Sequence, residues 1–204
     1  MKNKRVNFKK SAGFILVLLV LSASLLGCFN VERVDSPAIR EEIKSRTVKQ
    51  ITSQQFTAIT QLWGKDFASS IQKEMERYLA ATKVNPAEIC GIRGLYKTDS
   101  VKKIYRLQVK LLTRKDLSNK ALSPKEIQVL DAFAYNAENK LPPSENVQKL
   151  NDSLMLFSLQ LPYNSAICKA CLQGDPTNLA VLNVIIPKKT IVRNITVKEL
   201  KKIK

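Results

Sequence analysis

The feature of this 204-residue sequence that most constrains its fold is a stretch of apolar residues with helical spacing, over about residues 37–82. Ser36 and Pro37 open the stretch with a hydroxyl that can cap a helix and a proline suited to its first turn. Apolar side chains then recur with the spacing of an amphipathic helix. We predict one long helix, or two in series with a break near Thr52 and Ser53 or near Gly64. Such a helix packs on a core or on a copy of itself, so the sequence permits a homodimer through it.

Shorter helix and strand signals follow this stretch. Asn85 with Pro86 begins a short helix, and Ser123 with Pro124 begins another that ends near Asn139. Runs rich in apolar and β-branched residues predict strands over residues 101–112, 154–161 and 180–186, a polar loop over 113–122, and a last strand or extended tail over 191–197. Helices, a strand, a helix and then strands predict an α+β fold in which helices cover an antiparallel sheet.

The N-terminus has the pattern of an export signal. Residues 1–13 carry five basic side chains and no acidic one, and the apolar run 14–26 is too short for a comfortable membrane span. The run ends Leu-Leu-Gly-Cys28, which resembles the lipobox of bacterial lipoproteins and implies lipidation of Cys28. The alternative is a short membrane anchor with an incidental cysteine.

This signal predicts the organisation and the location of the chain. We expect a signal peptide over 1–27, a lipidated tether over 28–36, a domain over 37–197 and a basic tail over 198–204. Several acyl chains would anchor the protein stably in the cell envelope. Phe29, where an Asp would favour inner-membrane retention, indicates the periplasmic face of the outer membrane if the source is Gram-negative.

Charge and composition narrow the classes of function. The net charge of +17 falls to +12 when the signal peptide is removed, and the chain contains no histidine. The absence of histidine excludes Ser-His-Asp and Cys-His triads, histidine-ligated zinc and the C-x-x-C-H haem motif. An address outside the cytoplasm argues against nucleic acid, so membrane lipid or an envelope polyanion is the expected counter-surface, unless the basic face is simply solvated. We expect no enzymatic activity.

Two sets of side chains are candidates for binding. Arg106 and Lys110 would share one face of the strand predicted over 101–112, where they could bind an anionic ligand or be solvated. Trp63 and the other aromatic residues of the long helix could form a partner face, although core packing is the commoner use of such residues.

Three cysteines remain in the mature domain, namely Cys90, Cys168 and Cys171. In an oxidising compartment we expect one structural disulfide and one buried free thiol, and a pair that includes Cys90 would contribute about 4 kcal/mol by the chain-entropy model. A redox-active pair of Cys168 and Cys171 is a second hypothesis, and metal binding by the three thiolates is a third.

A family resemblance rests on four short pieces in a fixed order. They are the helix end Ala87–Cys90, the basic segment Arg106–Lys110 with Arg114 and Asn119 beyond it, the strand Phe157–Pro162, and Cys168 with Cys171 followed by Gly174 and Ile185–Pro187. Over roughly residues 40–190 this order resembles a family of bacterial extracytoplasmic PAS-like domains, some of which bind c-type haem.

The resemblance implies a PAS-like sensory or ligand-binding domain. In haem-binding members it would make Cys90 an axial thiolate and Cys168 and Cys171 the thioether anchors. Leu172 stands where those members have their haem histidine, so we expect no covalent haem c and no other cofactor; a haem-binding electron-transfer protein with unusual ligation is an alternative hypothesis. The expected partners are membrane lipid through Cys28 and a small ligand.

Overall fold

The computed structural model describes residues 50–81, 85–172, 174–175 and 177–203, all within one compact unit that spans Val48–Lys204. The predicted signal peptide, Cys28, the tether and the start of the predicted long helix lie outside the described residues. The elements are α3 (Ser53–Leu79), α4 (Pro86–Cys90), α5 (Tyr96–Tyr105), β1 (Gln108–Thr113), the 3-10 helix η1 (Arg114–Ser118), α6 (Pro124–Glu138), β2 (Glu145–Lys149), β3 (Leu154–Gln160), α7 (Ala166–Cys171), β4 (Ala180–Pro187), α8 (Lys188–Asn194) and α9 (Val197–Lys202).

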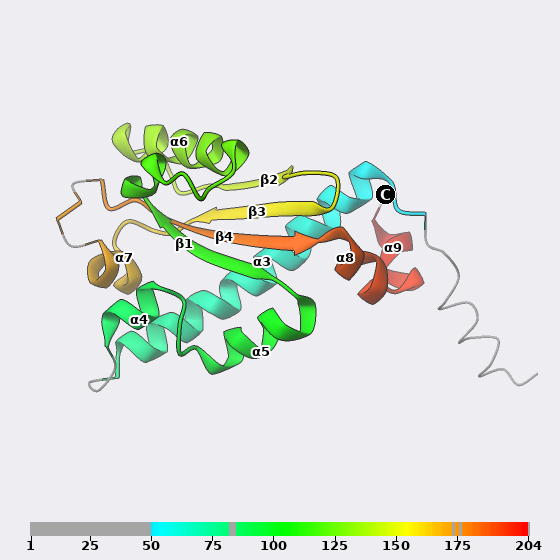
Figure 1. Ribbon diagram of the computed structural model, residues 1–204, viewed down its shortest axis with the longest axis horizontal. Helices are drawn as coiled ribbons and strands as arrows, with labels where there is room; N and C mark the ends of the chain where they lie inside the picture. The colour runs from blue at the N-terminus through cyan, green and yellow to red at the C-terminus, as the bar shows by residue number, and fades with distance from the viewer. Residues whose placement is uncertain (1–49, 82–84, 173, 176, 204) are drawn as a thin grey trace, which may run out of the picture. The chain divides into compact units, whose positions relative to one another are not determined.

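The sheet has four antiparallel strands in the order β1-β4-β3-β2, which confirms the α+β prediction (Figure 1). Because side chains alternate along a strand, the sheet has two buried faces. Phe157, Leu182 and Val184 pack with α3 in one cluster, and Leu156 and Ile185 pack with α6 in the other. The sheet is therefore the middle layer of the domain.

Helix α3 begins with a capping box at Thr52. The Thr52 hydroxyl accepts from the backbone N–H of Gln55, whose side chain in turn accepts from the N–H of Thr52. The helix therefore begins at one of the two breaks that the sequence predicted. At the other, Gly64, it continues without interruption, because Gly64 is needed where α3 meets β3: a Cβ there would lie 2.2 Å from Cγ of Phe157.

Several predicted boundaries hold. Ser123 caps α6 in a box with Glu126, and the helix ends at Glu138, close to the expected Asn139. Strands β3 and β4 coincide with the predicted strands within a residue at each end. Local capping and apolar runs were sufficient signals in these cases.

The structure differs from the sequence-based expectations in four places. Residues 101–105 belong to the helix α5 and not to a strand, so only the second half of the predicted strand over 101–112 forms β1. Residues 191–197 lie mainly in α8 and α9 and not in a strand. Strand β2, which has a polar sequence at the edge of the sheet, was not predicted, and the loop over 113–122 contains η1.

Helix α5 was predicted wrongly because the residue that caps its start, Glu74, lies 23 residues before Lys97 in the sequence. Both Glu74 carboxylate oxygens accept backbone N–H groups at the start of α5, from Lys97 and Thr98, each at 2.8 Å. The Thr98 hydroxyl also donates to Glu74 Oε2 at 2.7 Å. A carboxylate on α3 thus supplies the cap that the local sequence of α5 lacks.

Among the described residues, no helix is long and apolar enough to cross a membrane.

Candidate functional site

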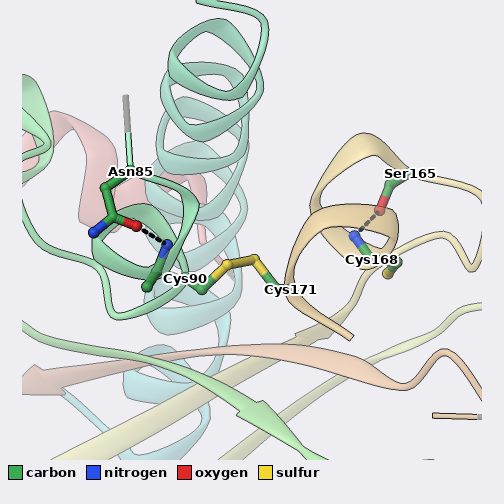
Figure 2. The surroundings of a disulfide bond; sticks show 6 residues. Asn85, Cys90, Ser165, Cys168 and Cys171 are labelled. Atoms are coloured by element: carbon green, nitrogen blue, oxygen red, sulfur yellow. Dashed lines mark hydrogen bonds between the residues drawn. A yellow bond between two sulfur atoms is a disulfide. The ribbon is translucent and has the colours of Figure 1, made fainter. Parts of the chain in front are cut away.

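Two short helices bring the domain's disulfide together. Cys90 ends α4 and Cys171 ends α7, and their sulfurs are bonded, with Cα atoms 5.5 Å apart and a sequence separation of 81 (Figure 2). Each helix is capped by a nearby side chain: Asn85 Oδ1 accepts from Ala87 N at 3.0 Å, and Ser165 Oγ accepts from Cys168 N at 3.2 Å. These caps start the helices in the register that presents the two sulfurs to each other.

Cys168 is the free thiol of the three, and it is fully buried. Its Sγ donates to the carbonyl of Pro162 at 3.3 Å. Burial raises the pKa of the Cys168 thiol, and the hydrogen bond with Ser165 opposes that rise only in part. Because the thiolate is the nucleophile in disulfide exchange, a buried thiol with a raised pKa is poorly suited to redox chemistry.

The structure thus contains one disulfide and one buried thiol, and it does not pair Cys168 with Cys171. The three sulfurs do not form a cluster of thiolates, since two of them are bonded to each other. In the part of the chain that the structure describes, no three Asp, Glu or Cys side chains are grouped as metal ligands.

Covalent haem does not fit this arrangement. The sulfurs of Cys90 and Cys171 are joined, so neither is available as an axial ligand or a thioether anchor. The Cys168 thiol faces the Pro162 carbonyl inside the core. Leu172, where the haem-binding proteins that the sequence resembles have a histidine, is buried in the same apolar cluster.

A pocket lies against the disulfide, along β1. Its volume is about 360 Å³, within the range of small-molecule sites. Strand β1 is at an edge of the sheet, and its residues from both faces line the pocket, which therefore follows the edge itself. The lining residues are 90–92, 109–112, 119, 121 and 122.

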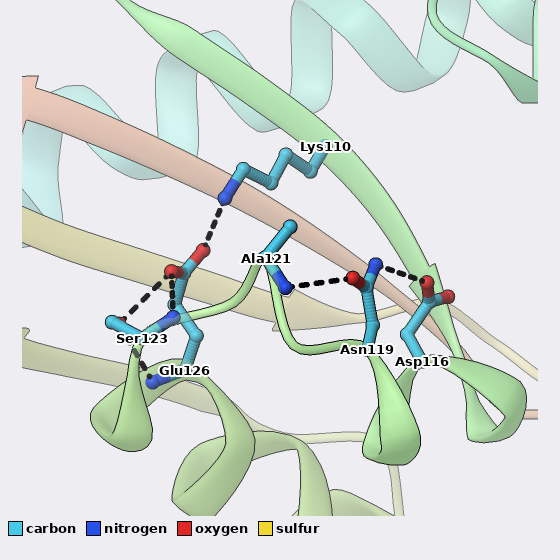
Figure 3. A network of polar contacts seen from close by, with 6 residues as sticks. All are labelled: Lys110, Asp116, Asn119, Ala121, Ser123 and Glu126. Carbon is cyan, nitrogen blue, oxygen red and sulfur yellow. Dashed lines mark hydrogen bonds and ion pairs between the residues drawn. The ribbon is translucent and has the colours of Figure 1, made fainter.

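Lys110, Asn119 and Ala121 of the pocket lining belong to a polar network, which Figure 3 shows. Lys110 on β1 donates to Glu126 Oε1 on α6 at 2.8 Å, and Glu126 Oε2 accepts from both N–H and O–H of Ser123. Asn119 donates to Asp116 Oδ1 at 3.2 Å and accepts from Ala121 N at 3.0 Å. These hydrogen bonds fix the loop between β1 and α6. They also hold Lys110 and Asn119, which line the pocket, in place.

Glu126 is a buried carboxylate that is held ionised. Its side chain is only 4% exposed, and this burial raises the pKa. The hydrogen bond from Lys110 and the two from Ser123 outweigh that effect and bring the pKa below the usual value of a glutamate. The Lys110–Glu126 ion pair therefore joins β1 to α6 through a buried carboxylate and an ammonium side chain that is partly exposed.

The structure separates the two predicted anion-binding residues. Lys110 lies on β1 and faces α6, but Arg106 lies outside the strand, at the C-cap of α5, where its φ is 54°. The two therefore do not share a strand face, because α5 occupies the chain up to Tyr105.

Trp63 lies in an aromatic group and is half-buried. Its ring centroid is 6.4 Å from that of Phe67 and 6.2 Å from that of Tyr105, in edge-on geometry. These contacts join α3 to α5 and belong to the core cluster.

Sequence reasoning missed a buried polar pair in the centre of the sheet. Ser158 on β3 and Asn183 on β4 are cross-strand partners on the α6 face, and both are almost fully buried. Within the described part of the chain, the Ser158 hydroxyl and both amide atoms of Asn183 make no hydrogen bond. The signal was present as a single asparagine in the apolar run Ala-Val-Leu-Asn-Val-Ile-Ile.

Comparisons of the sequence and the structure with protein-family models, with curated proteins and with solved structures found no match.

Proposed function

We propose that this chain is an exported protein, lipid-anchored at Cys28 in the cell envelope, whose PAS-like α+β domain binds a small ligand. It acts as a sensory or ligand-binding module without enzymatic activity. The observation that carries the proposal is the Cys90–Cys171 disulfide beside the pocket. Long-range disulfides are typical of oxidising compartments, which agrees with the lipoprotein-like signal.

The pocket favours binding over catalysis. Its polar groups include the Lys110 ammonium, which is already paired with Glu126, and the Asn119 amide. Both groups are hydrogen-bond donors and suit recognition of a hydrogen-bond acceptor. Apolar side chains such as Val109, Leu112 and Leu122 line the remainder. The ligand class is therefore a small, mainly apolar molecule that carries a carbonyl or carboxylate group.

Thiol and disulfide chemistry at Cys168 and Cys171 is a weaker alternative. The two are three residues apart on α7, but Cys171 is bonded to Cys90 and the Cys168 thiol is buried with a raised pKa. The same contacts explain a structural disulfide without further assumptions.

Binding of a fluorescent dye tests whether the pocket beside the disulfide can hold a ligand. Anilinonaphthalene sulfonate, an apolar anion whose fluorescence rises on burial, is titrated into the oxidised chain that begins at residue 28 with Cys28→Ser. We expect saturable binding that is lost in Ala121→Trp, because Ala121 lines the pocket and an indole would fill it. Ala132→Trp is the matched control, since Ala132 is exposed on α6 and does not line the pocket. Equal binding by both variants would refute the pocket assignment.

Anchoring is tested separately in cells. Metabolic labelling with a palmitate analogue should mark the full-length chain, and Cys28→Ser should abolish the label. Membrane fractionation of a Gram-negative host then reports the envelope location. A labelled Cys28→Ser chain, or a wild-type chain that is not labelled, would contradict lipidation at this residue.

A further inference from the structure

A second, smaller pocket lies at the junction of α5 and α8, away from the disulfide. Its volume is about 80 Å³, a few times the ~30 Å³ share of one water molecule. Three cationic side chains line it: Arg106 at the C-cap of α5, and Lys189 and Arg193 on α8. The pocket is large enough for a small anionic group such as phosphate, and three positively charged side chains line it.

None of these three side chains forms an ion pair with a carboxylate among the described residues, although five other ion pairs are formed there. Their charges therefore add at the pocket and are not cancelled locally. Arginine supplies fork-shaped donors that suit phosphate oxygens, and lysine supplies a point charge. Two arginines and a lysine around a small hollow are thus matched to a phosphate group.

The fold holds this pocket in place. Thr190 on α8 is buried and donates its hydroxyl to the carbonyl of Tyr105, the last residue of α5, at 2.9 Å. Asn194 donates to the carbonyl of Thr190 at 2.8 Å, one helical turn earlier. Arg106 is in the left-handed region with φ of 54°, a conformation in which glycine would be less strained. The C-cap position of α5 therefore carries the large cationic side chain of Arg106, although its backbone conformation favours glycine.

An apolar side chain beside the cations favours a lipid surface. Ile104 lines the pocket and is 69% exposed, and Val192 on α8 is also exposed. Basic groups flanked by exposed apolar side chains are typical of protein surfaces that lie at the boundary between headgroups and acyl chains.

The position of the pocket agrees with membrane anchoring. Lys188 on α8 lies over the Phe56 ring in the first turns of α3, with Nζ 5.2 Å from the ring centroid. The described chain therefore starts at the end of the domain that holds α8 and α9 (Figure 1). A chain tethered through Cys28 would enter the domain at this end.

We infer that Arg106, Lys189 and Arg193 bind the phosphate of an anionic phospholipid headgroup and thereby hold this end of the domain against the membrane. The choice of lipid over free phosphate rests on the proposed anchoring. The site itself rests on three cations around the pocket that form no ion pair with any of the residues that the structure describes.

The test measures sedimentation of the chain from residue 28, with Cys28→Ser, together with lipid vesicles. One set of vesicles is phosphatidylcholine alone, and the other contains phosphatidylcholine and phosphatidylglycerol in equal parts. We expect binding to the second set only, weakened by salt because exposed charges are screened. The triple variant R106Q/K189Q/R193Q should bind about a hundredfold more weakly, since each basic residue near such a surface contributes about fivefold.

The control is a triple variant with the same change in net charge, K120Q/K140Q/K169Q. These lysines are exposed and do not line the pocket. The control should bind within a few-fold of the parent chain, and circular dichroism should show all chains folded. Equal losses in the two triple variants would show that only diffuse charge matters and would overturn the site.

A third arm separates the sources of phosphate. Inorganic phosphate is titrated into the parent chain while the arginine side-chain NMR signals are followed. Saturation by inorganic phosphate without vesicle binding would assign the pocket to a soluble anion and overturn the lipid proposal. The chain carries no lipid and the dye pocket is intact, so failure here is distinguishable from failure of anchoring or of ligand binding.

Discussion

Replacement of Gly64 by alanine sets two effects of opposite sign against each other. In an exposed helix, alanine is more favourable than glycine by about 1 kcal/mol. At Gly64 the new Cβ would lie 2.2, 2.5 and 2.6 Å from three carbons of Phe157, far inside the ~3.5–4.0 Å of favourable contact. Phe157 is fully buried on β3, so its ring cannot move into solvent. Overpacking of about 3 kcal/mol should exceed the helix gain and leave a net loss of about 2 kcal/mol.

The assay is equilibrium unfolding in urea, followed by circular dichroism with the disulfide intact. Ser69→Ala, at an exposed position of the same helix, is the control and should change the free energy of unfolding by less than about 0.5 kcal/mol. In a Phe157→Leu background, Gly64→Ala should cost at least ~1 kcal/mol less than in the parent chain, because the clashing ring is gone. If Gly64→Ala is neutral or stabilising in the parent chain, the close approach of α3 and β3 is not as described.

Four further predictions follow from individual contacts. Replacing Cys90 and Cys171 by alanine should lower the free energy of unfolding by about 4 kcal/mol, measured in urea, and added reductant should then have no further effect. In the Cys28→Ser chain, Cys168 should react with Ellman's reagent only after unfolding; fast reaction of the native protein would contradict its burial. Because folding lowers the pKa of Glu126, its ionised carboxylate stabilises the fold at pH values above the ordinary glutamate pKa near 4.5. This stabilisation is lost as the pH falls through the folded-state pKa, so in Glu126→Gln the free energy of unfolding should depend less on pH on the acid side. Glu74→Gln should cost about 2 kcal/mol and speed hydrogen exchange at the start of α5, whereas unchanged exchange would refute its capping role.

The elements that the sequence predicted well are those whose signals are local. Ser123 and Glu126 cap α6 from within its own first turn, and β4 is an apolar run that only a buried strand or helix could use. Helix α5 was missed because its cap is Glu74, on another helix, and because its residues Val101 and Ile104 also suit a strand. Strand β2 has no apolar run, since it occupies an edge of the sheet.

The candidate sites depended even more on tertiary structure. The sequence left three pairings of Cys90, Cys168 and Cys171 open, and the choice is made by where the sheet places α4 and α7. Arg106 was identified as a candidate anion ligand, but its basic neighbours are on α8, more than eighty residues later, and not on β1. A pairing of that range cannot be obtained from spacing alone, because it depends on the order of the strands. Lipidation, the PAS-like assignment and a homodimer remain predictions.

The order of the strands also determines when the domain could form during the export that we propose. Strand β4 is the last strand in the sequence, yet it lies between β1 and β3. A chain that crosses a membrane from its N-terminus delivers β1 first, and β1 then has no strand to pair with until residue 180 has emerged. The disulfide of Cys90 likewise cannot form until Cys171 has emerged. A chain that stops before β4 can therefore form only the β2–β3 hairpin, with β1 unpaired and the Cys90 thiol reduced, and the complete sheet has to wait for the last strand.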